Sequence, residues 1–198
     1  MPRINWKASL GQIVLEVFSI MLGVYLGLLV TQWSERQKEG KEKEQTRLSL
    51  IEEMQTNRER LGKVLDYHQM LRDSTWHIYN NRAKLTERPT FFRGLQVSSL
   101  PDGAYQTAIL SESINLFSQK DIRAITDLYS FQRDYNEFAK LALSGLITQD
   151  IMREDNILQL ARYIGITMTD ICGMEKNLIK SYELVEKTLE LKKGATRG

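Results

Sequence analysis

The sequence is poor in cysteine, proline and glycine: its 198 residues include one cysteine, three prolines and twelve glycines. A single cysteine forms no intrachain disulfide and builds no cysteine-rich zinc site, which excludes a disulfide-stapled secreted scaffold. With so few helix breakers, long helices are favoured. The chain also lacks an excess of charge of either sign, because 27 Lys and Arg face 25 Asp and Glu, for a formal net charge of +2. This balance argues against nucleic acid as the main partner.

Side chains that carry catalysis or bind metals are equally scarce. His68 and His77 lie on opposite faces of a continuous helix, so they cannot share one metal ion. His68 falls on an apolar stripe and is predicted to be a hydrogen-bonded core histidine, whereas His77 follows Asp73 by one turn and is predicted to pair with it at the surface. Cys172 adjoins another apolar stripe and is predicted to be a buried thiol. Because no catalytic or phosphate-binding motif is present either, we predict no enzymatic activity, no cofactor and no metal.

One long apolar run is present, from residue 10 to residue 30. At about 1.5 Å per residue, a helix of this length crosses the roughly 30 Å hydrocarbon core of a membrane. Trp6 and Trp33 flank the run, as expected for residues at the two interfaces. The run exceeds the 7 to 15 apolar residues of a cleaved signal peptide, and no small-residue cleavage site follows it. We therefore predict that residues 1–33 are an uncleaved membrane anchor.

Polar and small residues within the predicted span are candidates for contacts. Gln12 and Glu16 are four residues apart and share a helix face, while Gly23 and Gly27 form a GxxxG pattern that lets a second helix approach closely. Glu16 has two interpretations that the sequence leaves open. It is an ion or proton site or a contact with a partner helix, or it lies shallow enough to be neutral or to reach water.

The remaining chain, residues 34–198, is predicted to be one α-helical domain. Alternating acidic and basic residues after Trp33 indicate a solvated helix that leaves the membrane. Apolar periodicity then divides the domain into a juxtamembrane helix at 34–82, a loop at 83–104, a short helix plus a helix at 105–147, and a long C-terminal helix at 148–193. The fold class is therefore all-α, with one transmembrane helix continuing into a helical bundle or coiled-coil domain of about four helices.

Local signals place some helix ends. The breaker-rich stretch after Thr86 predicts an ordered loop or crossover, and the residues from Tyr105 to Phe117 predict a short helix. Ser118 is expected to cap the next helix, and Thr148 the last one.

The strongest periodicity lies in the last helix. Alternating steps of three and four residues form a stripe suited to a core except at Glu175. This stripe packs either within one chain's bundle or between chains as a coiled coil, and the pattern does not choose between the two. As a self-association seam it would consist of Ala161, Ile164, Met168, Ile171, Leu178, Tyr182, Val185 and Leu189.

Two stretches resemble a known family. GQIVLEVFSIMLGVYLGLLVTQWSERQKE resembles the N-terminal signature of a family of bacterial single-span membrane proteins that carries only a domain-of-unknown-function label, with Gly11, Ile13, Trp33 and Glu35 at its marked positions and Gln12 where the family has an acidic residue. AYQTAILSESINLFSQKDIRAITDLYSF is similar to the family's short helix, turn and helix. The resemblance implies a membrane-anchored helical domain and no activity or catalytic residues.

The leading functional hypothesis is a membrane-anchored scaffold or accessory subunit of a membrane protein assembly. The alternative is a small homo-oligomeric channel or ion-coupled device that uses Gln12 and Glu16. Expected partners are membrane lipid and further copies of the chain or other membrane subunits. Basic residues are more numerous after the span than before it, which favours the cytoplasmic side of a bacterial inner membrane for the helical domain.

Overall fold

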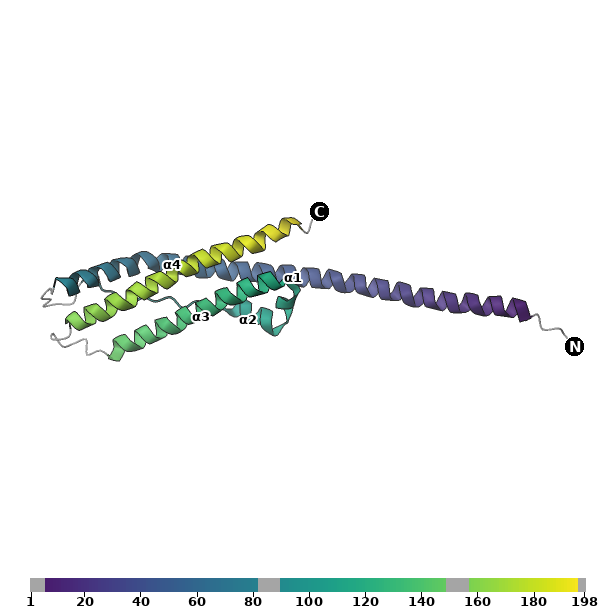
Figure 1. Cartoon of the computed structure of the whole chain (residues 1–198), viewed down its shortest axis with the longest axis horizontal. Helices are drawn as coiled ribbons and strands as arrows, with labels where there is room; N and C mark the ends of the chain where they lie inside the picture. The colour runs from purple at the N-terminus through teal and green to yellow at the C-terminus, as the bar shows by residue number, and fades with distance from the viewer. Residues whose placement is uncertain (1–5, 82–89, 149–156, 196–198) are drawn as a thin grey trace. The chain divides into compact units, whose positions relative to one another are not determined.

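The computed structural model describes residues 6–81, 90–148 and 157–195. These residues form four α-helices and one short 3-10 helix, with no strand among them, which confirms the all-α prediction (Figure 1). The elements in chain order are α1 (Trp6–Asn80), α2 (Gly103–Leu110), η1 (Ser113–Leu116), α3 (Gln119–Thr148) and α4 (Ile157–Ala195).

The chain divides into two compact units, Met1–Gln45 and Thr46–Gly198. We call the first the N-terminal unit and the second the helical unit. The N-terminal unit consists of the first part of α1. Its helix has no proline after Trp6, and the acidic and basic residues that follow Trp33 can pair at i,i+4 spacing, so no residue there ends the helix.

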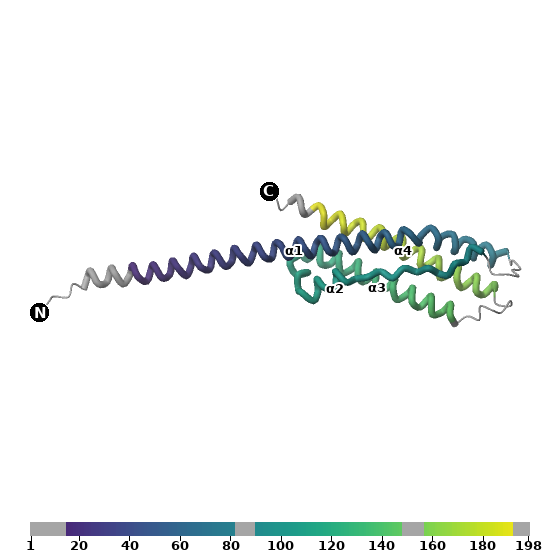
Figure 2. The backbone as a smooth tube through the Cα atoms, turned by 180° about the vertical axis from the view of Figure 1, so that it is seen from behind, coloured from purple at the N-terminus to yellow at the C-terminus, as the bar shows by residue number. Residues whose placement is uncertain are grey.

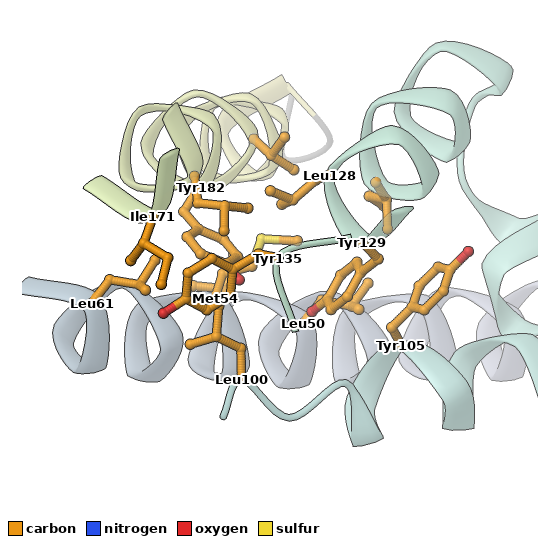
Figure 3. Close-up of a cluster of buried hydrophobic side chains, with 14 of the residues drawn as sticks. Leu50, Met54, Leu61, Leu100, Tyr105, Leu128, Tyr129, Tyr135, Ile171 and Tyr182 are labelled. Atoms are coloured by element: carbon orange, nitrogen blue, oxygen red, sulfur yellow. The ribbon is translucent and has the colours of Figure 1, made fainter. Parts of the chain in front are cut away.

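The helical unit packs α3 and α4 together with the second part of α1 around a single hydrophobic core. Tyr135 of α3 and Tyr182 of α4 are completely buried at its centre, close to Met54 of α1 (Figure 3). Burial of such large side chains supplies most of the favourable free energy of folding. The apolar periodicity of α3 and α4 therefore identifies faces that meet within one chain.

An extended segment completes this core. Residues 92–102, which we call the strap, have no regular secondary structure and run along the helices between the end of α1 and the start of α2 (Figure 2). Leu95 and Leu100 of the strap are 1% and 2% exposed. The predicted loop at 83–104 is thus a core element where it is described, and residues 82–89 lie outside the described part of the chain.

The predicted helix from Tyr105 to Phe117 is interrupted. α2 ends at Leu110, and Glu112 has a φ of 59°, in the left-handed region that a side chain enters only at a cost of about 1–2 kcal/mol. The backbone then resumes as η1. Neither Pro nor Gly stands at this break, so the sequence pattern does not predict it.

The two predicted helix caps have different outcomes. The backbone N–H of Asp121 donates to Oγ of Ser118 at 3.3 Å, and that hydroxyl donates to the Asp121 carboxylate at 2.6 Å, which confirms the cap of α3. The prediction for Thr148 is wrong, because Thr148 is the last residue of α3 and α4 begins at Ile157. The residues between them, 149–156, lie outside the described ranges.

Candidate functional site

The N-terminal unit carries an apolar segment, residues 15–33, whose side chains are all exposed in the single chain. Leu15 is 68% exposed, Val30 65% and Trp33 66%. This part of α1 is long and apolar enough to cross a membrane, judged by length and composition. The other predicted interface anchor, Trp6, is the first residue of α1, and its side chain lies outside the described ones.

Glu16 is the acidic residue of this apolar segment. Its side chain is exposed, and no hydrogen bond or ion pair joins it to another residue that the structure describes. Gln12 lies one turn earlier on α1, at a position whose side chain is not among those described. By contrast, the hydroxyl of Thr31 donates to the carbonyl of Gly27 at 3.0 Å, so this polar group is satisfied within the helix.

The small residues of the segment share the face of Glu16. At about 100° per residue, Glu16, Ser19, Gly23 and Gly27 fall within roughly one quarter of the helix circumference. A Cβ atom added at Gly23 or Gly27 would meet no atom within 4 Å. The face formed by these four residues is therefore uncovered in the single chain. Ser19 was not among the residues that the sequence pattern placed on it.

A buried cluster of polar side chains joins the elements of the helical unit. His68 of α1 and Glu175 of α4 are both completely buried, and Nδ1 of His68 lies 2.9 Å from Oε1 and 3.1 Å from Oε2 of Glu175. Nε2 of His68 lies 2.7 Å from the carbonyl oxygen of Leu95 in the strap. Tyr135 of α3 donates its hydroxyl hydrogen to Oε1 of Glu175 at 3.0 Å. The predicted core histidine is thus confirmed, and Glu175, the exception in the apolar stripe, is its partner.

A second buried cluster holds the strap through side-chain amides. Nε2 of Gln132 donates to the carbonyls of Leu100 and Pro101 at 3.0 Å and 2.9 Å. Oε1 of Gln132 accepts from the Tyr182 hydroxyl at 2.5 Å and from Nδ2 of Asn57 at 3.2 Å. One buried amide of α3 therefore bonds the strap, α4 and α1 at once.

Further contacts fix the two ends of the strap. Asn136 bonds the backbone of Leu100 in both directions, at 2.8 Å and 3.0 Å. Tyr67 accepts from the N–H of Arg93 at 2.9 Å and donates to the carbonyl of Gly94 at 2.6 Å. Gly94 has a φ of 89°, which suits glycine, and Gln96 has a φ of 51°. Because strap carbonyls bond to buried side chains, the segment needs no partner strand.

Next to α2, a carboxylate from α1 replaces a local cap. Glu53 accepts hydrogen bonds from the backbone N–H groups of Ala104 and Tyr105 at 2.8 Å and 3.4 Å. It also accepts from the hydroxyl of Tyr129 at 2.7 Å. Burial of Tyr129, reinforced by the adjacent Glu53 carboxylate, raises the pKa of this phenol above its ordinary value, so Tyr129 donates at any physiological pH.

The apolar stripe of α4 lies inside the chain's own core. Each member is between 0% and 6% exposed within a single chain, and the hydrophobic core that covers them is formed by α1, α3 and the strap. The structure therefore selects the intramolecular alternative and corrects the expectation of a seam between copies. The buried positions are Ala161, Ile164, Met168, Ile171, Leu178, Tyr182, Val185 and Leu189.

The other candidate side chains are used structurally. Cys172 is 1% exposed, and burial, together with the negative charge of Glu175, raises the pKa of its thiol to about 11, which confirms the predicted buried thiol. The predicted pairing of His77 with Asp73 is wrong: Asp73 accepts from Arg72 at 2.8 Å, and the His77 ring contacts Asn81. Among the described residues, no group of three or more His, Cys, Asp or Glu could hold a metal ion.

Comparison with protein-family models, curated proteins and solved structures finds no match to this chain. The resemblance to a bacterial single-span family therefore stays a prediction. The exposed apolar segment and the buried polar clusters are the features of the chain that bear on its function.

Proposed function

We propose that the protein is a membrane-anchored helical scaffold or accessory subunit of a membrane protein assembly. The observation that carries this proposal is the apolar segment at 15–33, whose side chains are exposed in the single chain. A continuous apolar surface of this size is costly in water and stable in lipid, at roughly 25 cal/mol for each square ångström removed from water. The segment therefore acts as the anchor.

The arrangement of polar side chains supports a role without catalysis. His68, Glu175 and Cys172 carry the chemistry that enzymes use, and each is buried and bonded or packed within the core. A substrate would have to open the bundle to reach them. Their contacts hold the strap and the helices together, as a scaffold that binds partners requires.

We further propose that the anchor lies in a bacterial inner membrane with the helical unit in the cytoplasm. Support comes from the larger number of Lys and Arg residues after the span than before it. Protease added to intact spheroplasts tests this orientation. A helical unit that resists digestion until the cells are lysed supports it, and digestion in intact spheroplasts contradicts it.

The partner of the anchor is proposed to be another span, in the first instance a second copy of the chain. Glu16 lies within the apolar segment and has no partner among the described residues, and an ionisable group in lipid is stabilised when a neighbouring helix bonds it. Gly23 and Gly27 on the same face are open, so a second helix can approach closely there.

The decisive measurement is the mass of the purified protein in detergent, for the full chain and for a form that begins at Ser34. We expect an oligomer for the full chain and a monomer for the shortened form. A Gly27→Leu substitution should weaken the oligomer, and Met21→Leu, on the opposite side of the helix, is the control. A full chain that is monomeric across detergents, or that purifies in fixed ratio with another protein, would overturn self-association.

The alternative, a small channel or ion-coupled device, is favoured by the exposed carboxylate of Glu16 in the apolar segment. It is tested by ion flux through vesicles that contain the protein. A flux that the full chain supports and that Glu16→Gln changes would favour the channel. Absence of flux, or a flux that Glu16→Gln leaves unchanged, favours the scaffold.

A further inference from the structure

We infer that His68 and Glu175 share one proton in the folded helical unit, and that this proton is a pH-sensitive latch that holds the strap against α4. The inference rests on which atoms must donate in the buried cluster. It concerns the helical unit alone and does not depend on the anchor.

The carbonyl of Leu95 determines which nitrogen of His68 must carry a hydrogen. The carbonyl oxygen can only accept, so Nε2 of His68, 2.7 Å away, must carry a hydrogen. Nδ1 of His68 then faces the carboxylate of Glu175 at 2.9 Å and 3.1 Å. Without a proton between them, a lone pair on nitrogen would face an anionic oxygen in a completely buried place.

One proton between His68 and Glu175 satisfies their contact, whichever of the two residues carries it. An imidazolium can donate to a carboxylate, or a carboxylic acid can donate to a neutral imidazole. Both forms have a net charge of zero, which a buried pair tolerates far better than an isolated carboxylate. The folded pair therefore holds one proton more than neutral histidine plus ionised glutamate.

Groups around the pair offer no substitute for this proton. Tyr135 on α3 already donates its hydroxyl hydrogen to Glu175, and His68 is the ion-pair partner of Glu175 among the described residues. The thiol of Cys172 on α4, with a pKa of about 11, and the phenol of Tyr135, with a raised pKa, keep their hydrogens below pH 8.5. Tyr67, beside His68 on α1, is bonded to the strap.

The direction of the pH dependence follows from the unfolded chain. There, histidine holds its added proton only below about pH 6.5 and glutamate only below about pH 4.3. Above pH 6.5 the folded pair holds one proton and the unfolded pair none, so stability falls as pH rises. Between about pH 4.3 and pH 6.5 the folded and the unfolded pair each hold one proton, so the stability of the fold does not change with pH. Below about pH 4.3 the unfolded pair holds two protons and the folded pair one, so stability falls on acidification.

The latch joins every main element of the helical unit. His68 comes from α1, Leu95 from the strap, Tyr135 from α3 and Glu175 from α4. When the proton leaves, the contact between α1 and α4 becomes repulsive, and the hydrogen bond to Leu95 loses the support that orients the imidazole. We therefore expect the hydrogen-exchange protection of the strap amides to fall when the shared proton is lost.

Hydrogen exchange of the full chain in detergent tests the latch. The readout is the protection of amides at 92–102 between pH 6 and pH 8.5, after correction for the intrinsic exchange rate and where exchange follows the opening equilibrium. We expect protection to be flat up to about pH 6.5 and then to fall by up to tenfold per pH unit, the dependence that one proton imposes.

Two variants separate the proton from the packing. Glu175→Gln presents an amide N–H to Nδ1 of a neutral His68 and has no shared proton to lose. Its protection should therefore not fall above pH 6.5, and it should rise by about fourfold between pH 6 and pH 8.5, because the unfolded His68 gives up its proton over that range. His77→Gln removes the exposed histidine and should keep the full dependence.

The inference is overturned if the unsubstituted chain shows no fall in protection above pH 6.5, or if Glu175→Gln shows the same fall. Should Glu175→Gln not fold, the double substitution His68→Gln and Glu175→Gln takes its place, because it removes both titrating groups. The unsubstituted chain remains decisive by itself in that case, since a shared proton requires its pH dependence.

Discussion

The apolar segment and the core of the helical unit use polar groups in opposite ways. In the apolar segment, bulky side chains face outward and Glu16 has no described partner. In the helical unit, polar side chains are buried and bonded across elements, as with Gln132 and His68. The polar side chains of these core clusters are bonded within the chain, whereas Glu16 of the segment has no partner among the described residues. The contrast separates a folded helical unit from an apolar surface that is exposed in the single chain.

Charges placed in the apolar segment should have the largest effect, on the fraction of protein bound to membranes. We expect the double substitution Leu22→Arg and Leu26→Arg to release the protein from membranes, since each central arginine costs about 2.5–3.5 kcal/mol on insertion. Flotation of membranes on a density gradient measures the bound fraction. The control is Leu184→Arg, at a position 68% exposed in the helical unit, which should leave the bound fraction unchanged. Equal loss from both forms would refute the anchor.

Truncation inside the core should have the next largest effect. Leu178 is completely buried, and Leu178→Ala should lower the free energy of unfolding by about 2–5 kcal/mol. Leu184 on the same helix is 68% exposed, and Leu184→Ala should change it by less than about 0.5 kcal/mol. Urea unfolding of the full chain in detergent gives both values. Similar losses would contradict the intramolecular position of the stripe.

Removal of one buried amide tests whether the polar clusters stabilise the fold. Gln132→Met keeps much of the volume but leaves the Leu100 and Pro101 carbonyls without this donor. We expect a loss of about 1–3 kcal/mol in the free energy of unfolding. The exposed Gln119 supplies the matched control, Gln119→Met, whose effect should stay near zero. If the two variants unfold at the same urea concentration, the amide contacts contribute nothing.

Local patterns were sufficient for some features of the helical unit. The juxtamembrane helix predicted at 34–82 ends within two residues of Asn80, where α1 ends, because the apolar spacing stops there. Ser118 could be recognised as a cap because the cap bonds a residue three positions away. His68 could be placed in the core because it falls on an apolar stripe. Each of these features depends on neighbours in the sequence.

Features that depend on distant residues escaped prediction. Glu175 interrupts an apolar stripe, and only its contact with His68, which comes from another helix, explains why a carboxylate stands there. The strap was expected to be an ordered loop or crossover, because its prolines and glycines mark it as irregular and do not show that Gln132 bonds its carbonyls. For Glu16 no partner is present among the described residues, so the contacts of the structure do not assign it a role.

The smallest expected changes in the free energy of unfolding come from alanine substitutions at two glycines of α4. A Cβ atom at Gly173 would meet nothing within 4 Å, so Gly173→Ala should stabilise the helix by about 0.5–1 kcal/mol. A Cβ atom at Gly165 would lie 3.1 Å, 3.2 Å and 3.3 Å from three ring atoms of Trp76. That ring is held by a hydrogen bond from its Nε1 to Thr169 at 3.2 Å.

Because the indole must shift to admit a methyl group at Gly165, Gly165→Ala should gain less than Gly173→Ala or lose stability. Both variants alter the same helix, so intrinsic helix propensity cancels in the difference between their free energies of unfolding. The remaining difference measures the packing of Trp76 against the α4 backbone. Equal gains would mean that the indole moves aside freely, and that this contact between α1 and α4 adds nothing to the stability of the helical unit.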